Sequence, residues 1–511
     1  MLYRWAAGLA LVAAHLAHDA QAFKMLLHKH QTSGRSKSSQ SSRRRDVIPE
    51  PISIENVFDL YYSSTFTIGG QDLEVQLDTG SSELWVRPKQ DFAPPVQSSN
   101  ITLVVRYGIG NFEGALTSGE VIMGNVSIPK QSWLTYKQGQ IDNVFQAGLD
   151  GMLGLGFSEV STVLKNVRTQ TKDDSGRTLL ANYFLANPSE PRTFSMFINR
   201  RDDPNSKDDG VLMIGAPEPE YASVVTAPSQ PLHIDASYQR WANYLDAVEV
   251  NGVNITLPPT VVTGAPAGKH VANIDSGTSL VWAPTAAVDA IYKDIPGARY
   301  FPDQDQYTVP CMSAPRVALW FGGQRFPISP MDLTRVLTDS NKEKYCTNAI
   351  LHTAALSSQT HNLDWQIGDT GMRNWVTQFD YGTAGQPETA NIRMVSTVSD
   401  ELAAFNSFYQ VRAKQLGVAA PPPITALPGA PGSTSTKAES SSGTETSFPT
   451  PSAPPGAPPT TDTDDSADGS NGQSSQPSDN APAQNLDGAA ISPRVSAGLV
   501  ASLALTVALL C

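Results

Sequence analysis

Short apolar runs separated by glycine, asparagine, aspartate and proline fill the middle of the chain, residues 46–400. Apolar and polar positions alternate along 64–68 and 73–77, and these two runs flank a Gly-Gly pair at 69–70. The alternation predicts two strands joined by a tight turn. The helical period is confined to short stretches such as 286–291. We therefore predict a mainly β fold with two β-rich lobes, because the region is too long for one small sandwich.

Residues 1–22 predict a secretory signal peptide. Arg4 precedes an apolar run that ends at Leu16, and the small residues Ala20 and Ala22 form a cleavage pattern. A membrane anchor is the alternative, but the run is too short to span a bilayer. We therefore expect the chain to enter the secretory pathway, where disulfides persist.

Residues 23–45 are basic and rich in serine, and they contain no acidic residue. They end in three consecutive arginines, 43–45, which resemble the site of a dibasic-cleaving processing protease. We interpret the segment as a propeptide that such a protease removes. A solvated basic linker of low order is the alternative.

The region after the β-rich part divides into a helix and a polar segment. Asp400 and Gly417 are cap signals that bracket apolar positions in helical order, and they predict a spacer helix over 399–417. Residues 418–488 are rich in proline, serine and threonine. Such a composition cannot bury a core, so it predicts a disordered, O-glycosylated stalk.

Residues 489–511 have the order of a glycosylphosphatidylinositol (GPI) attachment signal. Small residues around Gly488 are followed by a short polar spacer and by an apolar run from Val495 to Cys511. This order predicts that the lipid is attached at Gly488 and that the rest is removed. A tail-anchored membrane helix is the alternative, but no basic residue follows the run. We therefore expect a cell-surface protein held on the plasma membrane, with the cell wall as a second location.

The charge and the cysteine content exclude some classes of protein. The chain has 36 basic and 49 acidic residues and a formal net charge of −13. A nucleic-acid binder needs a basic face and is not expected. Three cysteines are too few for a cysteine-dense mini-fold or for a zinc site built from four cysteines.

One motif occurs twice, once in each half of the β-rich region. Residues 77–86 read LDTGSSELWV, and residues 274–282 read IDSGTSLVW. Each copy has an aspartate, Asp78 or Asp275, between an apolar residue and a small hydroxyl residue, and a glycine follows. An aspartate in this context lies at a tight turn, where glycine lets the backbone pass close to a neighbour. The following hydroxyl groups can orient its carboxylate.

Two such turns that face one another bring two carboxylates together. Like charges at that distance cannot both ionise near neutral pH, so the pair shares one proton. The ionised carboxylate then activates water as a base, and the protonated one acts as an acid. The repeat therefore predicts hydrolysis by Asp78 and Asp275. A glycosidase also uses two carboxylates, but these need not lie in Asp-small-Gly turns.

Each half also has a later segment that ends in glycine, 152–154 (MLG) and, less clearly, 366–368 (QIG). We expect these segments to pack beside the two aspartate turns. A third Asp-Thr-Gly begins at Asp369, but Met372 and Arg373 follow it in place of hydroxyl residues. We interpret Asp369 as a structural residue, with an arginine as its candidate partner.

With these motifs the chain resembles the pepsin-like aspartic proteases over residues 55–397. The sequence YGIG at 107–110 is similar to the flap of that family, the hairpin that closes over the substrate, and 150–156 is similar to the segment that follows it. The resemblance implies a bilobal fold with an active-site cleft between an N-terminal lobe, 46–230, and a C-terminal lobe, 231–398. It also implies polypeptide substrates, a monomer, and no metal or organic cofactor.

The resemblance assigns roles to individual residues. The first hydroxyl residue of each turn is implied to bond across the lobe interface, and the hydroxyl after the glycine to hold the outer carboxylate oxygen. The flap tyrosine is implied to close the site, with its hydroxyl near an indole. The implied catalytic pair is Asp78 and Asp275. The implied turn residues are Thr79, Gly80, Ser81, Ser276, Gly277 and Thr278. The implied flap residues are Tyr107 and Gly108, and the indole is that of Trp85.

The chain departs from the family in a few places. Glu83 stands where the family usually has a neutral residue. The loop before the flap is short and has no cysteine, so the small disulfide of the N-terminal lobe is absent. Cys311 and Cys346 stand where the disulfide of the C-terminal lobe would be, and pairing is the default in a secreted chain. Two free thiols are the alternative.

Three Asn-x-Ser/Thr sequences are candidate acceptors of N-linked glycans. They begin at Asn100, Asn125 and Asn254, each near a predicted turn. We expect glycosylation there if the chain is secreted, although such sequences also arise by chance.

With its signal and its anchor, the chain resembles the yapsin-type and related GPI-linked fungal aspartic proteases. We expect an aspartic-type endopeptidase at the cell surface that hydrolyses peptide bonds at acidic pH. A catalytically silent protein that uses the fold for binding is the alternative, although both aspartates and the flap tyrosine are intact. The cleavage preference stays open between basic and hydrophobic residues: Glu83 or Glu113 would favour Lys or Arg only if it lay near the cleft.

Overall fold

A computed structural model describes the chain between residues 52 and 428. The predicted signal peptide, the propeptide, the stalk beyond residue 428 and the GPI signal with Gly488 lie outside the described residues. Within the described part, the description omits Phe58, Ile109, Asp202, 204–207, 235–238, Ser340 and 354–362.

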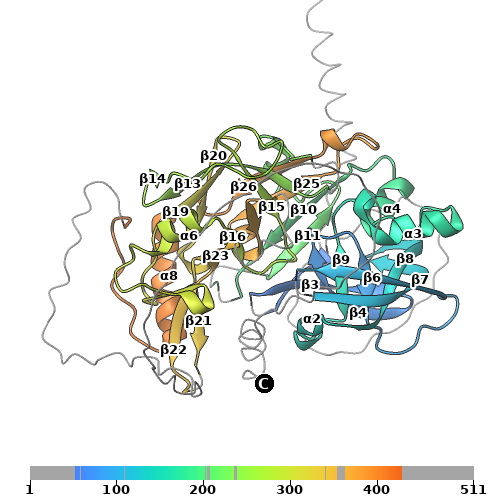
Figure 1. Ribbon diagram of the computed structural model, residues 1–511, viewed down its shortest axis with the longest axis horizontal. Helices are drawn as coiled ribbons and strands as arrows, with labels where there is room; N and C mark the ends of the chain where they lie inside the picture. Colours follow the sequence, from blue (N-terminus) through green and yellow to red (C-terminus); the bar gives the residue numbers. More distant parts are fainter. Residues whose placement is uncertain are drawn as a thin grey trace, which may run out of the picture. The chain divides into compact units, whose positions relative to one another are not determined.

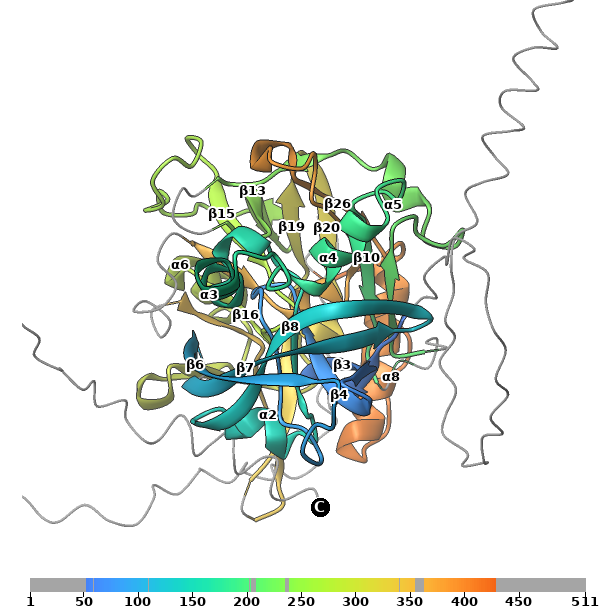
Figure 2. The same ribbon diagram turned by 90° about the vertical axis from the view of Figure 1, so that its right-hand side faces the viewer.

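An eight-stranded sheet carries most of the N-terminal half (Figure 1). The hairpin predicted at 64–68 and 73–77 is present as two antiparallel strands, and both glycines of its turn have positive φ, which a tight hairpin turn requires. Three long antiparallel strands end the sheet (Figure 2). In spatial order the strands are β2 (Glu55–Val57), β3 (Tyr61–Ile68), β4 (Gln71–Asp78), β9 (Gly151–Gly154), β5 (Leu84–Val86), β8 (Val126–Gly139), β7 (Gly110–Met123) and β6 (Gln97–Tyr107).

Helices accompany this sheet, and the two longest of them bury apolar side chains. α4 (Leu179–Ala186) buries Leu180 and Phe184 in the same core as strands β3 and β4. α3 (Thr162–Thr171) begins at Ser161, whose side chain accepts the Leu164 N–H at 3.0 Å and so caps the helix. The other short helices of this half are α2 (Asp142–Gln146), η1 (Ser158–Val160) and α5 (Ser223–Thr226).

A six-stranded sheet takes strands from both halves of the chain. β10 pairs with β11 on one side and with the much later β25 on the other. Phe194 of β10 stacks on Phe379 of β25 with ring centroids 4.6 Å apart, and Trp241 packs against both rings. The strands, in spatial order, are β1 (Ile52–Ser53), β11 (Gly210–Ile214), β10 (Thr193–Ile198), β25 (Trp375–Asp380), β26 (Asn391–Ser396) and β12 (Gln230–Pro231).

The C-terminal half holds a second eight-stranded sheet and a four-stranded sheet. The larger sheet has the order β20 (Gln324–Ile328), β19 (Val317–Phe321), β13 (Ala242–Val250), β15 (His270–Ile274), β24 (Trp365–Ile367), β16 (Val281–Ala283) and β23 (Ile350–His352), with β14 (Val253–Asn254) paired to β13. The smaller has the order β17 (Arg299–Phe301), β18 (Gln306–Val309), β22 (Lys344–Asn348) and β21 (Thr334–Thr338). Short helices are α6 (Thr285–Tyr292), η2 (Pro302–Gln304), η3 (Pro330–Asp332), α7 (Asp369–Met372) and η5 (Pro387–Thr389). The fold is mainly β, as the sequence predicts.

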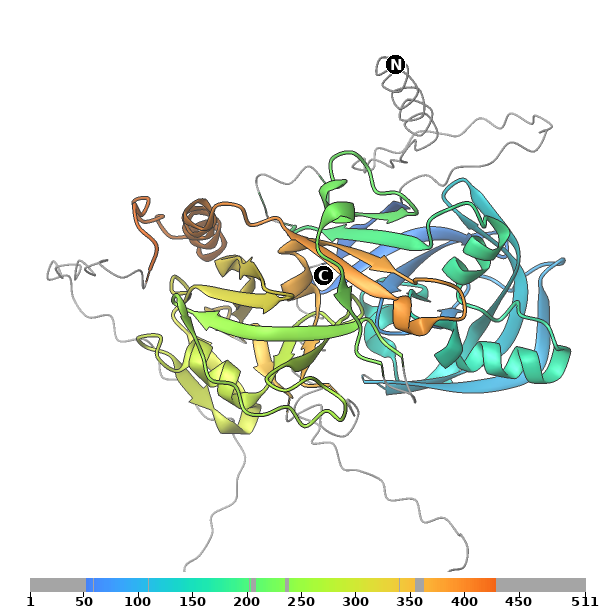
Figure 3. The same cartoon turned by 90° about the horizontal axis from the view of Figure 1, so that it is seen from above.

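The last described helix, α8 (Glu401–Leu416), packs on the C-terminal half and lies away from the N-terminal strands (Figures 1 and 3). Asp400 caps its first turn by accepting the Ala403 N–H, and Gly417 ends it at φ 75°. Arg325 binds Glu401 at the start of the helix, at 2.6 Å. Among the described residues, no helix is long and apolar enough to cross a membrane.

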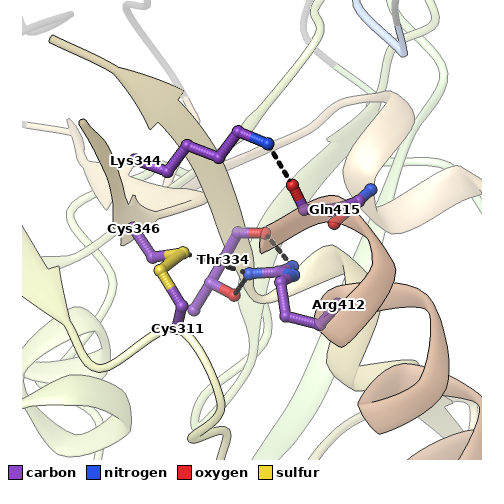
Figure 4. Close-up of a disulfide and its surroundings, with 6 residues drawn as sticks. All are labelled: Cys311, Thr334, Lys344, Cys346, Arg412 and Gln415. Atoms are coloured by element: carbon purple, nitrogen blue, oxygen red, sulfur yellow. Dashed lines mark hydrogen bonds between the residues drawn. A yellow bond between two sulfur atoms is a disulfide. The ribbon is translucent and has the colours of Figure 1, made fainter. Parts of the chain in front are cut away.

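The predicted disulfide between Cys311 and Cys346 is formed, and α8 lies beside it (Figure 4). The Arg412 side chain of α8 is buried and donates to the Thr334 hydroxyl at 2.9 Å and to the Thr334 carbonyl at 3.0 Å. It also lies 3.4 Å from the Cys346 sulfur. Burial lowers the pKa of Arg412 to about 10. The helix is therefore an integral part of this half of the fold.

Candidate active site

The two aspartate turns follow strands in matching places of the two eight-stranded sheets. β4 ends at Asp78, and β15 ends directly before Asp275. Each strand lies parallel to a later strand, β4 to β9 and β15 to β24. Alternate apolar side chains such as Leu73, Val75 and Leu77 are fully buried and fix the face of the first strand. The repeat in the sequence is therefore also a repeat in the structure.

Asp78 is held by donors from its own turn. The Gly80 N–H donates to Oδ1 at 2.8 Å, and the Ser81 hydroxyl donates to Oδ2. The side chain is 4% exposed. Both oxygens therefore have a partner that orients the carboxylate, as the resemblance implies for Ser81.

Asp275 has the same pair of donors in the second turn. The Gly277 N–H donates to Oδ1 at 2.8 Å, and the Thr278 hydroxyl donates to Oδ2 at 2.9 Å. Gln366 donates to the same Oδ2 through its side-chain amide. Asp78 has no counterpart of this third contact among the described side chains, and the sequence reasoning missed it.

The two turns face one another through their glycines. A Cβ atom added to Gly80 would lie 2.4 Å from Oδ1 of Asp275, and one added to Gly277 would lie 2.2 Å from Oδ1 of Asp78. Both distances are far too short for a real contact, so any side chain at either position would push the opposite carboxylate away. The glycines are therefore what permits the carboxylates to approach.

Thr79 and Ser276 join the two halves directly beneath the carboxylates. The Thr79 hydroxyl donates to the Ile274 carbonyl at 2.8 Å and accepts the Ser276 N–H at 3.0 Å. In the mirror arrangement, the Ser276 hydroxyl donates to the Leu77 carbonyl at 2.8 Å and accepts the Thr79 N–H at 3.1 Å. Both hydroxyls are buried, so these four bonds fix the spacing of the two turns.

Burial and the neighbouring carboxylate raise the pKa of Asp78 well above its usual value. Loss of water is the larger cause and the charge of Asp275 the second, and hydrogen bonds from Ser81 and Gly80 offset part of the rise. A pair of this kind holds one proton over a pH range in which isolated carboxyls would both be ionised.

The predicted flap is the hairpin of β6 and β7, with Tyr107 at the end of β6 and Gly108 exposed in the turn. The Tyr107 hydroxyl oxygen is buried. Burial raises the pKa of Tyr107, the charges of Glu83 and Asp78 add to the rise, and contacts with Ser81 and Trp85 offset part of it. The phenol therefore stays protonated and lies between the Trp85 indole and the first aspartate turn.

Asp369, the start of the third Asp-Thr-Gly, is fully buried at the start of α7. Neither of its carboxyl oxygens has a hydrogen-bond partner among the described residues. The expected ion pair between Asp369 and an arginine is not formed among the described residues. Arg373, the nearby arginine, forms its ion pair with Asp332 at 2.8 Å. Burial raises the pKa of Asp369 well above its usual value, the charge of Arg373 offsets part of the rise, and Asp275 adds to it.

Glu83 is buried, so it is not an exposed acid that a substrate could reach. Its carboxylate accepts the Thr162 N–H at 2.6 Å, at the first residue of α3, and burial raises its pKa. Glu113 lies on β7 and accepts the Gln138 side-chain amide at 2.9 Å. The three candidate glycosylation residues, Asn100, Asn125 and Asn254, are all exposed.

Two buried carboxyl groups that face one another, held in matching turns beside a tyrosine hairpin, are the arrangement of an aspartic endopeptidase. Comparison with known proteins leads to the same class. The sequence profile described as "Eukaryotic aspartyl protease" matches residues 61–386. The chain belongs to this family.

Individual relatives agree with the family. The chain is 28% identical over 346 residues to "Aspartic protease" of Phaffia rhodozyma, covering 63% of this chain and 74% of the relative. It is 26% identical over 347 residues to "Pepsin A" of Sus scrofa, covering 64% and 80%. The crystal structure of an aspartic proteinase from Irpex lacteus has a TM-score of 0.52 at 17% identity and covers 70% of this chain and 99% of that structure. The predicted pepsin-like fold is therefore confirmed.

Proposed function

We propose that this endopeptidase hydrolyses polypeptides at the cell surface in acidic surroundings, with Asp78 and Asp275 as its catalytic pair. The observation that carries the proposal is the matched geometry of the two turns. Each carboxylate is fixed by one backbone N–H and one hydroxyl, and each glycine leaves room only for the opposite carboxylate.

In the proposed reaction the two carboxyls exchange protons with one water molecule. The ionised Asp275 takes a proton from the water molecule while the water oxygen attacks the carbonyl carbon of the substrate. At the same time, protonated Asp78 gives its proton to the carbonyl oxygen. The tetrahedral intermediate then returns that oxygen's proton to Asp78, the C–N bond breaks, and the leaving nitrogen takes the proton held by Asp275. The pair ends as it began, so no cofactor is consumed.

The requirement for one proton on the pair supports work at acidic pH. Above the pH at which this proton is lost, both carboxylates are charged and no acid remains to protonate the substrate carbonyl. Below the pH at which both are protonated, no base remains. Activity therefore follows a bell-shaped curve with its maximum in acid.

The location and the maturation steps are proposed from the two ends of the chain. The signal at 1–22 would direct secretion, and a dibasic-cleaving protease would remove 23–45 after the three arginines. The signal at 489–511 would then attach a GPI lipid near Gly488. A phospholipase C specific for phosphatidylinositol should release the protein from intact cells, and a protein that stays on the cells after this treatment contradicts the anchor.

Cleavage of a mixed peptide library tests the activity. The full chain, produced in a secretory host and processed, is incubated with the library from pH 3 to pH 7, with and without the inhibitor pepstatin. We expect pepstatin-sensitive internal cuts that peak in acid, and the residues beside the cuts decide between basic and hydrophobic preference. Folded, processed protein that makes no cut at any pH would favour the silent binding protein.

A further inference from the structure

The two halves of the site differ at several matched positions, and one of them lies on the strands beside the carboxylates. In the first half Met152 of β9 lies opposite Gln76 of β4, one step before the Leu77–Leu153 pair. In the second half Gln366 of β24 lies opposite Asn273 of β15, one step before the Ile274–Ile367 pair. The registers are the same, so Gln366 is the structural equivalent of Met152. The matched position is therefore apolar in the first half, where it is Met152, and polar in the second, where it is Gln366.

The amide of Gln366 is oriented by contacts at both of its ends. Its Nε2 donates to Oδ2 of Asp275 and lies 3.2 Å from the Thr278 hydroxyl oxygen. Its Oε1 accepts the side-chain N–H of Asn273 at 3.2 Å. Because the oxygen already faces a donor, the nitrogen is the atom that faces the carboxylate. The assignment of the two amide atoms is therefore set by the hydrogen-bond network.

Met152 cannot do the same for the first carboxylate. Its sulfur lies 3.8 Å from the Ser81 hydroxyl, a weak contact that does not reach Asp78. The outer oxygen of Asp78 therefore accepts one side-chain donor, from Ser81, and the outer oxygen of Asp275 accepts two, from Thr278 and Gln366. A carboxylate that accepts more N–H and O–H donors is stabilised in its ionised form relative to its protonated form.

We propose that Gln366 is a positioning residue that fixes Asp275 as the ionised member of the pair and so sets the acid limit of activity. This inference rests on the proposed function and deepens it. The amide is neutral at every relevant pH, so its effect does not itself titrate. It acts only by lowering the free energy of the ionised Asp275 carboxylate.

Other ionisable groups also lie beside the pair, and the two carboxyl groups among them, Asp78 and Asp369, oppose Gln366. Asp78 faces Asp275 directly, and Asp369 of α7 acts on both aspartates. Tyr107 of the flap faces Asp78 and is protonated. Negative charge on Asp78 or Asp369 disfavours ionisation of Asp275. The donor from Gln366 is thus the difference between the two halves that favours the ionised form of Asp275.

The test is the pH dependence of kcat/KM for Gln366→Met, which gives the second half the residue of the first. Loss of a donor to a charged group should move the acid limb of the curve toward higher pH by about one unit. The alkaline limb should move less. Met152→Leu is the matched control, because it changes packing at the equivalent position without changing a donor to either carboxylate. Its acid limb should coincide with that of the wild type.

A second variant keeps the test decisive if Gln366→Met does not fold. Asn273→Leu leaves Gln366 in place but frees its amide oxygen, so the acid limb should move in the same direction by a smaller amount. If the wild type cleaves peptides and neither variant moves the acid limb, the inference is overturned and the proposed function stands. If the wild type itself does not cleave, the proposed function fails and the inference falls with it.

Discussion

The turn that carries Asp78 and the turn that carries Asp275 make the same bonds to their own glycine and hydroxyl residue, but their surroundings differ. Beside the first turn, β9 contributes Met152 and is followed by Leu155. Beside the second, β24 contributes Gln366, and Asp369 occupies the place of Leu155. One side of the pair is therefore packed by apolar groups and the other by an amide and a carboxyl.

This difference separates what a motif provides from what its neighbours provide. The Asp-small-Gly sequence fixes each carboxylate by bonds within four residues, so two copies give two equal turns. The neighbouring strands then decide which carboxyl holds the proton. The site is therefore a symmetric pair of turns in asymmetric surroundings, and substitutions can change the pair or its surroundings separately.

The largest effect is expected where the halves are equal. Asp78→Asn and Asp275→Asn should each lower kcat at the optimal pH by at least about 10³-fold, because the proposed reaction needs both an acid and a base. The two losses should be similar in spite of the different surroundings. Activity against one peptide measures this, with binding of pepstatin and circular dichroism as controls for folding. A variant that keeps a tenth of the activity would remove its aspartate from the mechanism.

The next effect concerns Asp369, whose pKa is raised by burial. The folded protein therefore binds the proton of Asp369 more tightly than the unfolded chain does. As a result, the free energy of unfolding falls as pH rises above about 4, the pKa of an aspartate in the unfolded chain. Asp369→Asn keeps the shape but cannot ionise. At pH 7 we expect the variant to have a higher free energy of unfolding than the wild type. The difference should be about 1.4 kcal/mol for each pH unit by which the folded-state pKa of Asp369 exceeds its unfolded-state pKa, counted up to pH 7. At pH 3.5 the variant and the wild type should agree.

Denaturant unfolding at the two pH values measures this effect. The control is Asp173→Asn, since Asp173 is a surface carboxyl paired with Lys130 at 2.7 Å. The pKa of Asp173 is lowered, chiefly by its hydrogen bond with Lys130, so its contribution has the opposite sign and is lost as pH falls. An exposed pair of this kind contributes at most about 1 kcal/mol. Equal behaviour of Asp369→Asn and the wild type at pH 7 would show that the third turn carries no buried charge.

The sequence predicts the parts of this site that depend on local pattern. Alternation at 64–68 and 73–77 was enough for the hairpin, and the repeat was enough to single out Asp78 and Asp275, because their donors lie within three residues of each. The role of Gln366 was out of reach, since Asp275 lies 91 positions away and only the parallel pairing of β15 and β24 joins them. The only local signal was a polar residue at the place that holds Met152 in the first half.

The smallest effect concerns the fifth position after each aspartate, Glu83 in the first half and Leu280 in the second. Glu83 caps α3 through the Thr162 N–H, a contact that spans 79 positions and that sequence reasoning could not place. Glu83→Ala removes the acceptor and should lower the free energy of unfolding by about 1 kcal/mol. Glu83→Gln keeps an acceptor oxygen and should lose less. Urea unfolding near pH 5 distinguishes the two, and an equal loss in both variants would mean that the charge of Glu83, and not its oxygen, stabilises the start of α3.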